Sequence, residues 1–328
     1  FSVHFTTILT LSWRNLWRNR RRTAIMLGAI SVGVWAMIFM TALMRGMVDD
    51  MLNQGIRNLP GHIQIQHPEF LDDPNVVNSI DEAQGDLLAA LKDGGSRVWA
   101  NRIRVPAVIA SERESRGVNL VGIEPLSEAD ITGLPGQIAA GRFLESNDDK
   151  GLVIGAKLAE RLETRLGKRV VVMSQDPDNN IAERGFRVVG MYRAELAAQE
   201  EFNVYAGRET LQKLLKIEGR VSQIVLVDDD YRDVEALYQR IAQAAPEGLE
   251  VKPWYEIDTY LAVMFNMMDG FVLVWVVIIF LALSFGLVNT LVMAVFERIR
   301  EIGLIQALGM RPGLIVYQIL LESLLLLL

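Results

Sequence analysis

Two long runs of uncharged, mostly apolar residues lie near the two ends of this chain. The first covers residues 23–44, and the second covers residues 271–296, which are 26 positions without a formal charge. About 20 apolar residues suffice for a helix to cross the ~30 Å hydrocarbon core of a bilayer. The pattern therefore predicts an integral membrane α-helical protein with transmembrane helices over 23–45 (TM1) and 270–296 (TM2).

The two ends of the chain extend this pattern. Residues 1–22 place Leu9, Trp13 and Trp17 on one side of a helix and arginines on the other, which is typical of an amphipathic helix at a membrane surface. A further apolar run over 313–328 is expected to begin a third span, TM3. We expect the rest of TM3 to lie beyond this sequence.

Between the two spans, residues 46–269 have the mixed periodicities of an α+β domain. Ile63 and Ile65 alternate with Gln64 and Gln66, which predicts a half-buried strand. A capping box formed by Ser79 and Glu82 and the leucines after it predict a helix. Recurring strand–helix–strand order favours compact α+β subdomains over a sandwich. Further strands are expected at 97–110, 118–123, 169–174, 186–192 and 222–228, and further helices at 155–166 and 231–244.

Two connecting segments, 46–58 and 254–269, lead from the spans to this domain. The first carries no helix breaker before Gly55, and the second follows Pro253. Both are expected to be helical stalks that tie the domain rigidly to TM1 and TM2.

The distribution of charge predicts the orientation in the membrane. Residues 14–22 contain five arginines and no acidic residue, whereas residues 46–269 carry 24 basic and 37 acidic residues. Because positively charged flanks stay in the cytoplasm, the N-terminus and the loop at 297–312 are expected there. The large acidic domain is then extracytoplasmic, inserted between the first and second transmembrane helices.

A charged segment follows the second apolar run directly. Acidic and basic residues alternate at its start, apolar residues follow at helical spacing, and glycine and proline end it before residue 313. Such a segment is typical of a short helix that leaves the membrane and packs on a partner, and its small residues would permit close approach. The candidate contact residues are Glu297, Arg298, Arg300, Glu301, Gly303, Ala307 and Gly309.

Composition and motifs limit the kinds of catalytic, metal and nucleotide sites that this chain can form. The absence of cysteine excludes disulfides and thiol-based sites. His62 and His67 lie five residues apart on or near a strand and do not share a face, so ordinary surface roles are favoured over a metal site. Residues 151–157 (GLVIGAK) lack the spacing and the GK[ST] ending of a phosphate-binding loop, and they fit a strand-to-helix turn. We expect no metal, no cofactor, no enzyme activity and no nucleic-acid partner for this chain.

Methionines at three- and four-residue spacing follow one face of the first span and its stalk. Because methionine adapts to varied apolar shapes, this methionine face is a candidate surface for a hydrophobic cargo, and plain helix packing is the alternative. Its residues are Met37, Met40, Met44, Met47 and Met51, with Met264, Met267 and Met268 at the matching end of the second span.

Small residues at four-residue spacing predict close helix–helix contacts within the membrane. They include Gly28 and Gly33 in the first span and Gly286 in the second, where Asn289 is able to add an interhelical hydrogen bond.

The charged segment resembles a known family. The order E-R-x-x-E-I-G-x-x-x-A-x-G at 297–309 resembles the cytoplasmic loop of FtsX-like/MacB-like ABC transporter permeases. Residues 118–125 (VNLVGIEP), 141–143 (GRF) and 152–162 (LVIGAKLAERL) resemble the MacB-type periplasmic core domain. The resemblance covers nearly the whole chain.

This resemblance implies a permease subunit of a type VII ABC system in the inner (cytoplasmic) membrane, with four spans and a periplasmic domain after the first. It implies a separate cytoplasmic ABC ATPase subunit, which binds ATP and Mg, and a second permease subunit in a homodimer or heterodimer. Residues 297–312 become the coupling helix and turn that receive ATP-driven motion. A periplasmic adaptor or lipoprotein carrier is a further partner that the family suggests.

Three functions stay open within the family. The methionine face favours extraction or movement of a lipoprotein or lipid-like cargo. Tripartite-efflux-type export of a small molecule or peptide is the second, and a non-transporting mechanical regulator of an envelope enzyme is the third.

Overall fold

A computed structural model describes residues 20–58, 61–92, 98–194, 197–228, 234–297, 299–307, 312–313 and 316–317. Contacts divide the chain into two units, each described by itself. Unit 1 consists of Phe1–Asp49 with Phe265–Leu328, and unit 2 is Asp50–Met264. Residues 1–19 of the lead-in predicted over 1–22, together with Arg298, Gly309 and most of the predicted TM3, lie outside the described residues.

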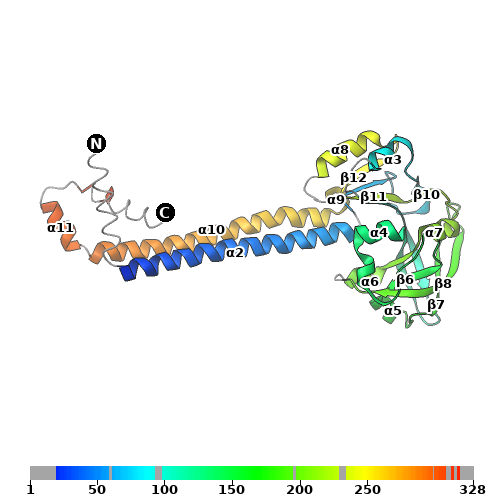
Figure 1. Ribbon diagram of the computed structural model, residues 1–328, viewed down its shortest axis with the longest axis horizontal. Coiled ribbons are helices and arrows are strands. Elements are labelled where there is room, and N and C mark those ends of the chain that lie inside the picture. Colours follow the sequence, from blue (N-terminus) through cyan, green and yellow to red (C-terminus); the bar gives the residue numbers. More distant parts are fainter. Residues whose placement is uncertain are drawn as a thin grey trace. The chain divides into compact units, whose positions relative to one another are not determined.

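The two apolar runs form the longest helices, as predicted (Figure 1). Helices α2 (Arg20–Asn58) and α10 (Thr259–Glu297) each contain 39 residues. Among the described residues, Ile30–Asn53 is the one helical stretch long and apolar enough to cross a membrane, with a mean hydropathy of 1.5, and Gly270–Gly286 is a shorter apolar stretch. The charged segment after α10 contains a short helix, α11 (Ile299–Ala307).

The first stalk is helical as predicted, but the second is interrupted. A one-turn helix, α9 (Trp254–Ile257), ends at Asp258, whose φ and ψ of −114° and 84° are not helical. The Oδ1 of Asp258 accepts a hydrogen bond from the backbone N–H of Leu261 at 3.0 Å. Asp258 therefore caps the start of α10, and α9 is a separate element.

Unit 2 is an α+β domain built on one ten-stranded mixed sheet and a separate two-stranded pair. The strands of the large sheet are β1 (Ile63–Gln66), β3 (Val98–Ala110), β4 (Ser115–Ile123), β5 (Ile138–Gly141), β6 (Gly151–Gly155), β7 (Arg169–Gln175), β8 (Ile181–Tyr192), β9 (Asn203–Gly207), β11 (Gln223–Val227) and β12 (Glu250–Pro253), and the pair is β2 (Ile80–Asp81) with β10 (Arg220–Val221). The helices are α3 (Gly85–Lys92), α4 (Pro125–Thr132), α5 (Ala156–Arg161), α6 (Ala197–Phe202), α7 (Arg208–Leu215) and α8 (Val234–Ala244), with 3₁₀ turns η1 (Val76–Asn78) and η2 (Leu134–Gln137).

Six of these strands close into a barrel. Pairing runs from β3 through β4, β9, β6, β8 and β7 and returns to β3. The β4–β9 and β6–β8 pairs are parallel, and the other four are antiparallel. Closure pairs both edges of the curved sheet, and β5 adds one further strand along β8.

The first half of β3 belongs to a second sheet segment in the order β12-β1-β11-β3, in which all pairs are antiparallel. Helix α8 packs on β12 and on α3, and Figure 1 shows α3 and α8 together at this part of unit 2. Because β3 has 13 residues, it is long enough to serve both the barrel and this segment. The strand therefore connects the two halves of unit 2.

Strand β1 is more buried than predicted. Gln64 and Gln66 are 1% and 0% exposed, although their alternation with isoleucine predicts a solvent-facing side. The strand has partners on both edges, β11 and β12, and residues on both of its faces are enclosed. Polar residues on a central strand can therefore mark a second buried face.

The predicted capping box is wrong. Helix α3 begins at Gly85, whereas Ser79 follows η1 and precedes strand β2. The carboxylate of Glu82 accepts hydrogen bonds from Arg208 and from Gln212 Nε2, the second at 2.8 Å. A tertiary partner on α7 thus replaces the local cap.

Helix α5 is also shorter than the predicted helix at 155–166. It ends at Arg161, and Glu163 has a φ of 48°, in the left-handed region that stops a helix. Leu162 is fully buried, but Leu166 is 42% exposed. The four-residue spacing of the leucines therefore continues to Leu166, although the helix has already ended.

Candidate functional site

The predicted coupling residues lie at the end of α10 and in α11. Glu297 is the last residue of α10, and Glu301 lies within α11. Arg300, Gly303 and Ala307 are exposed in α11. A helix is therefore present where the sequence predicts one, and the docking of this helix on a partner stays a prediction.

The methionine face of α2 contains exposed and half-buried side chains. Met40, Met47 and Met51 are 45%, 66% and 38% exposed, whereas Met37 and Met44 are half-buried. In α10, Met264 is half-buried and Met267 is 56% exposed, and Met268 belongs to the same helix. Cargo binding at this face stays a prediction.

The predicted packing residues also lie on α2 and α10. A Cβ atom added at Gly28 or at Gly286 would meet no atom within 4 Å. Gly33 is half-buried and Asn289 is exposed. Close approach of a second helix at Gly28 is therefore sterically open, and the predicted subunit contact stays a prediction.

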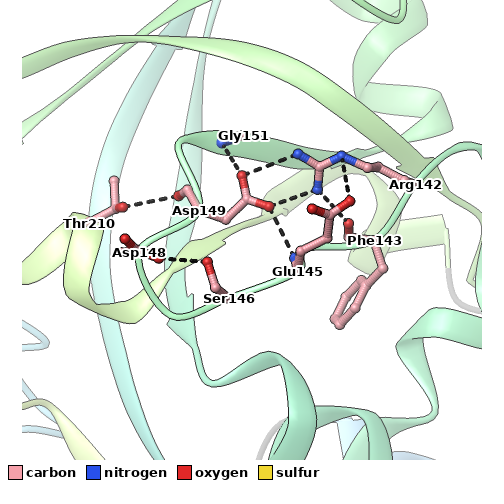
Figure 2. A network of polar contacts seen from close by, with 8 residues as sticks. All are labelled: Arg142, Phe143, Glu145, Ser146, Asp148, Asp149, Gly151 and Thr210. Atoms are coloured by element: carbon pink, nitrogen blue, oxygen red, sulfur yellow. Dashed lines mark hydrogen bonds and ion pairs between the residues drawn. The ribbon is translucent and has the colours of Figure 1, made fainter.

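A loop between β5 and β6 closes on itself through one ion pair. Arg142 Nη1 lies 2.7 Å from Asp149 Oδ2 and donates to the carbonyl oxygen of Phe143 at 2.8 Å. Figure 2 shows the Arg142 guanidinium facing the Asp149 carboxylate, which also accepts from the backbone N–H groups of Glu145 (3.0 Å) and Gly151 (2.8 Å). One carboxylate therefore holds both ends of this loop.

These contacts determine the charge states of the pair. Burial alone disfavours the charged carboxylate, but the hydrogen bonds from Arg142 and the backbone outweigh it and lower the pKa of Asp149. The hydrogen bond to Asp149 raises the pKa of Arg142. Both groups stay charged at neutral pH, so the pair is structural and is not suited to proton transfer.

The same loop is fastened to the start of α7. Thr210 Oγ1 donates to the carbonyl oxygen of Asp149 at 3.0 Å, and Glu209 N donates to that of Asn147 at 2.9 Å. A Cβ atom at Gly207 would lie 2.5 Å from the Asn147 oxygen, so glycine permits this close passage. The residues 141–143 that carry the family resemblance thus begin a rigid connection between β5, β6 and α7.

A second polar network is partly buried where α4 and α7 meet β3. Arg208 contacts the carboxylates of Glu82 and Glu124, the latter with Nε 3.0 Å from Oε1. Asn101 Nδ2 donates to the same Glu124 oxygen at 3.1 Å. No sequence motif indicates this cluster, because its members come from four segments far apart in the chain.

An apolar hollow of about 420 Å³ lies where β3 changes its partner from β11 to β7. Val76, Val105 and Met173 contribute to its walls, and Ile181 beside it is 74% exposed. This surface has no signal in the sequence, because only the tertiary fold brings its walls together.

The segments considered for metal or nucleotide chemistry have structural partners. His62 Nδ1 accepts from the backbone N–H of Asp228 at 2.7 Å, and His67 Nδ1 accepts from that of Glu69 at 3.2 Å. Within the described parts of the chain, no three His, Cys, Asp or Glu side chains are placed to hold a metal ion. Residues 151–157 are the whole of strand β6 and the first two residues of α5, which confirms the strand-to-helix turn.

The chain matches two protein-family profiles. The MacB-like periplasmic core domain matches residues 23–244, and the FtsX-like permease C-terminal domain matches residues 273–328. The first match alone covers more than half of the chain.

Two curated relatives and a solved structure are similar to this chain. It is 25% identical over 303 residues to the lipoprotein-releasing system transmembrane protein LolC of Neisseria meningitidis serogroup B, covering 89% of this chain and 70% of that protein. It is 24% identical over 322 residues to an uncharacterized ABC transporter permease of Methanocaldococcus jannaschii, covering 94% and 76%. The crystal structure of the periplasmic region of MacB from Actinobacillus actinomycetemcomitans aligns with a TM-score of 0.41 and 17% identity, covering 62% of this chain and 92% of that one.

The two family matches follow one another along the chain in the order that the sequence predicts, with the core domain first and the permease segment after it. The chain therefore belongs to the family of ABC transporter permeases that combine a MacB-like periplasmic core domain with an FtsX-like permease C-terminal domain.

Proposed function

We propose that this chain is the permease subunit of a type VII ABC transporter and transmits ATP-driven motion from a separate cytoplasmic ATPase to unit 2. The observation that carries the proposal is the continuity of α10. This helix begins at Thr259, directly after β12 and α9, and runs for 39 residues to Glu297 at the charged segment. At 1.5 Å per residue, its length of about 58 Å exceeds the thickness of a bilayer.

In this proposal α2 and α10 cross the inner membrane, the charged segment is cytoplasmic and unit 2 is periplasmic. The apolar stretch Ile30–Asn53 supports the first crossing, and the 26 uncharged residues at 271–296 support the second. Exposed side chains such as Phe280 (65%) and Phe285 (75%) fit a lipid environment or a second permease subunit. The family implies two further spans and such a second subunit.

The cargo we propose is hydrophobic and derived from a membrane, such as a lipoprotein or another lipid-like molecule. The name of the neisserial relative places that protein in a lipoprotein-releasing system. Met40, Met47 and Met267 offer flexible apolar surface on the two long helices. Export of a small molecule or peptide, and mechanical regulation of an envelope enzyme, are the alternatives that the experiment below separates.

Copurification tests the first step of this proposal. The tagged chain is purified from its own host membranes, and the ATPase that accompanies it is identified by mass spectrometry and assayed. Charge reversal at Glu297 and Glu301 is expected to remove the ATPase while unit 2 stays folded, because basic side chains at these positions would repel the cationic groups that the carboxylates are proposed to attract. Charge reversal at Glu183 and Glu218, two exposed carboxylates of unit 2, is the matched control.

The possible results of this experiment distinguish the three functions. An intact, active complex with the reversed Glu297 and Glu301 contradicts the coupling role. Copurified lipoprotein together with ATP hydrolysis stimulated by lipopeptide supports the hydrophobic cargo. A stably bound envelope hydrolase without such stimulation favours the regulator, and stimulation by soluble compounds alone favours export.

A further inference from the structure

A polar hollow of about 360 Å³ lies at the end of the barrel, between the β3–β4 turn and the loop from α5 to β7. Its walls carry four cationic side chains, Arg113, Arg165, Lys168 and Arg169, and two carboxylates, Glu112 and Glu163. Positive charge therefore prevails here, although the domain as a whole has more acidic than basic residues.

The frame of this hollow is well fixed. Ser111 Oγ donates to the carbonyl oxygen of Leu162 at 2.7 Å and accepts from the backbone N–H groups of Arg113 (3.2 Å) and Glu114 (3.1 Å). One hydroxyl thus ties the β3–β4 turn to the end of α5. The backbone segments that carry Arg113 and Arg165 are therefore joined at the hollow.

The two carboxylates offset only part of this positive charge. Glu163 is occupied by Arg113, whose Nη1 lies 2.5 Å from Glu163 Oε2. Across the described part of the chain, no carboxylate lies within 4 Å of a charged nitrogen of Arg165, Lys168 or Arg169. Glu112 alone is left to oppose these three charges.

The pairing of β7 with β8 brings a further positive charge close to the hollow. Arg169 on β7 is directly opposite Arg187 on β8, in an antiparallel pair that places like charges on the same exposed face. Such a pair is unfavourable by itself, since the Cβ atoms of opposed residues lie about 5 Å apart. Arg187 Nη1 donates to the carbonyl oxygen of Gly167 at 3.2 Å, within the loop that borders the hollow. A bound anion would relieve this repulsion.

We propose that this hollow binds the phosphate group of an anionic ligand, with Lys168 and Arg169 as the principal contacts and Arg165 beside them. A phosphate monoester carries up to two negative charges and three acceptor oxygens, and the diester of a phospholipid headgroup carries one charge and two free oxygens; either group can accept hydrogen bonds from several uncompensated donors. This phosphate pocket is independent of the proposed transport function. A phospholipid headgroup and a soluble phosphate ester share the recognised group.

The test uses the full chain in phosphatidylcholine nanodiscs and isothermal titration with two probes. Pyrophosphate represents a soluble ligand, and dihexanoyl phosphatidylglycerol below its micelle concentration represents a headgroup. The double variant Lys168→Gln with Arg169→Gln is expected to raise the Kd by about tenfold or more, as the loss of charge-assisted hydrogen bonds predicts. Lys213→Gln with Arg240→Gln removes the same charge from exposed positions of α7 and α8 and is the control.

Binding of either probe that is weakened by the pocket variant and unchanged by the control supports the phosphate pocket, and the tighter probe identifies the source. A second measurement guards against misfolding: the probe is expected to raise the thermal midpoint of the wild type and control but not that of the variant. The absence of binding by both probes, or equal weakening in the control, overturns the proposal.

Discussion

Arg102 on β3 and Glu128 on α4 form a two-contact ion pair in which each side chain is only 1% exposed. Nη2 lies 2.7 Å from Oε1, and Nε lies 2.9 Å from Oε2. Two charges are tolerated in such a place only when they are paired with good geometry, and a single charge left behind is costly. The pair therefore fixes α4 on the strand that the barrel and the sheet segment share.

Replacing Glu128 with Gln is expected to destabilise unit 2 by about 3–5 kcal/mol, because Arg102 would keep a buried and uncompensated charge. For a domain of this size the thermal midpoint would fall by about 10 °C. Near-ultraviolet circular dichroism of the purified full chain measures that midpoint. The control is Glu114→Gln, which removes the carboxylate of an exposed pair with Arg116 and should change stability by less than about 1 kcal/mol.

If Glu128→Gln and Glu114→Gln have equal effects, the buried pair does not fix α4. The double change Arg102→Met with Glu128→Leu gives a further check. It removes both charges and should recover most of the midpoint lost in Glu128→Gln.

The close passage of the β5–β6 loop over Gly207 gives a second prediction. Gly207→Ala places a methyl group 2.5 Å from the carbonyl oxygen of Asn147 and should displace the loop at a cost of about 1–3 kcal/mol. Gly185→Ala on β8 meets no atom within 4 Å and should be nearly neutral. The two midpoints are compared, and hydrogen exchange at Glu209, whose N–H binds Asn147, reports loop detachment. Equal midpoints would refute the steric argument.

A third prediction concerns pH and the turn between β7 and β8. Asp176 Oδ2 lies 2.7 Å from Lys216 Nζ, while Oδ1 accepts from the backbone N–H of Asn180 at 2.8 Å. The hydrogen bond from Lys216 is the largest of the effects that lower the pKa of Asp176 from 3.8 to about 2. A carboxylate with a lowered pKa stabilises the fold above the unfolded value, and this contribution is lost as pH falls through the folded value.

Asp176→Asn should therefore lower the thermal midpoint at about pH 6, and its difference from the wild type should shrink between pH 3.8 and about 2. Asp178→Asn, at an exposed neighbour that offers only its backbone N–H to Asp176, is the control. A midpoint difference that stays constant down to pH 2 would show that the Asp176 carboxylate charge is not responsible.

Local pattern predicted much of the fold. The strands at β3, β4, β7, β8 and β11 and the two long helices appear where periodicity and uncharged length predict them. These elements depend on which residues are apolar within one segment, and that information is local.

Long-range partners account for the failures. The barrel closes through the pairing of β3 with β7, which joins Ile109 to Val172 and has no local signal. Glu82 does not cap a helix as predicted, because its carboxylate binds Arg208 and Gln212 of α7. Gln64 becomes buried because strands come to lie on both sides of β1. These partners lie far away in the chain, 63 residues for Ile109 and Val172 and more than a hundred for Glu82 and Gln64.

The methionine face gives the last prediction, which concerns the proposed cargo. Alanine at Met40, Met44 and Met264 removes flexible apolar surface, and about 1.4 kcal/mol of lost binding corresponds to a tenfold change in affinity. We expect the concentration of a synthetic triacylated lipopeptide that half-maximally stimulates ATP hydrolysis by the assembled complex to rise by about tenfold or more. Alanine at Trp35, an exposed side chain on another side of α2, and at Met293 tests for a general loss of apolar surface. Unchanged stimulation in the methionine variant, or an equal loss in the control, would assign this face to helix packing. A cargo-binding surface should be sensitive to substitution on its own face of α2 and not on another apolar face.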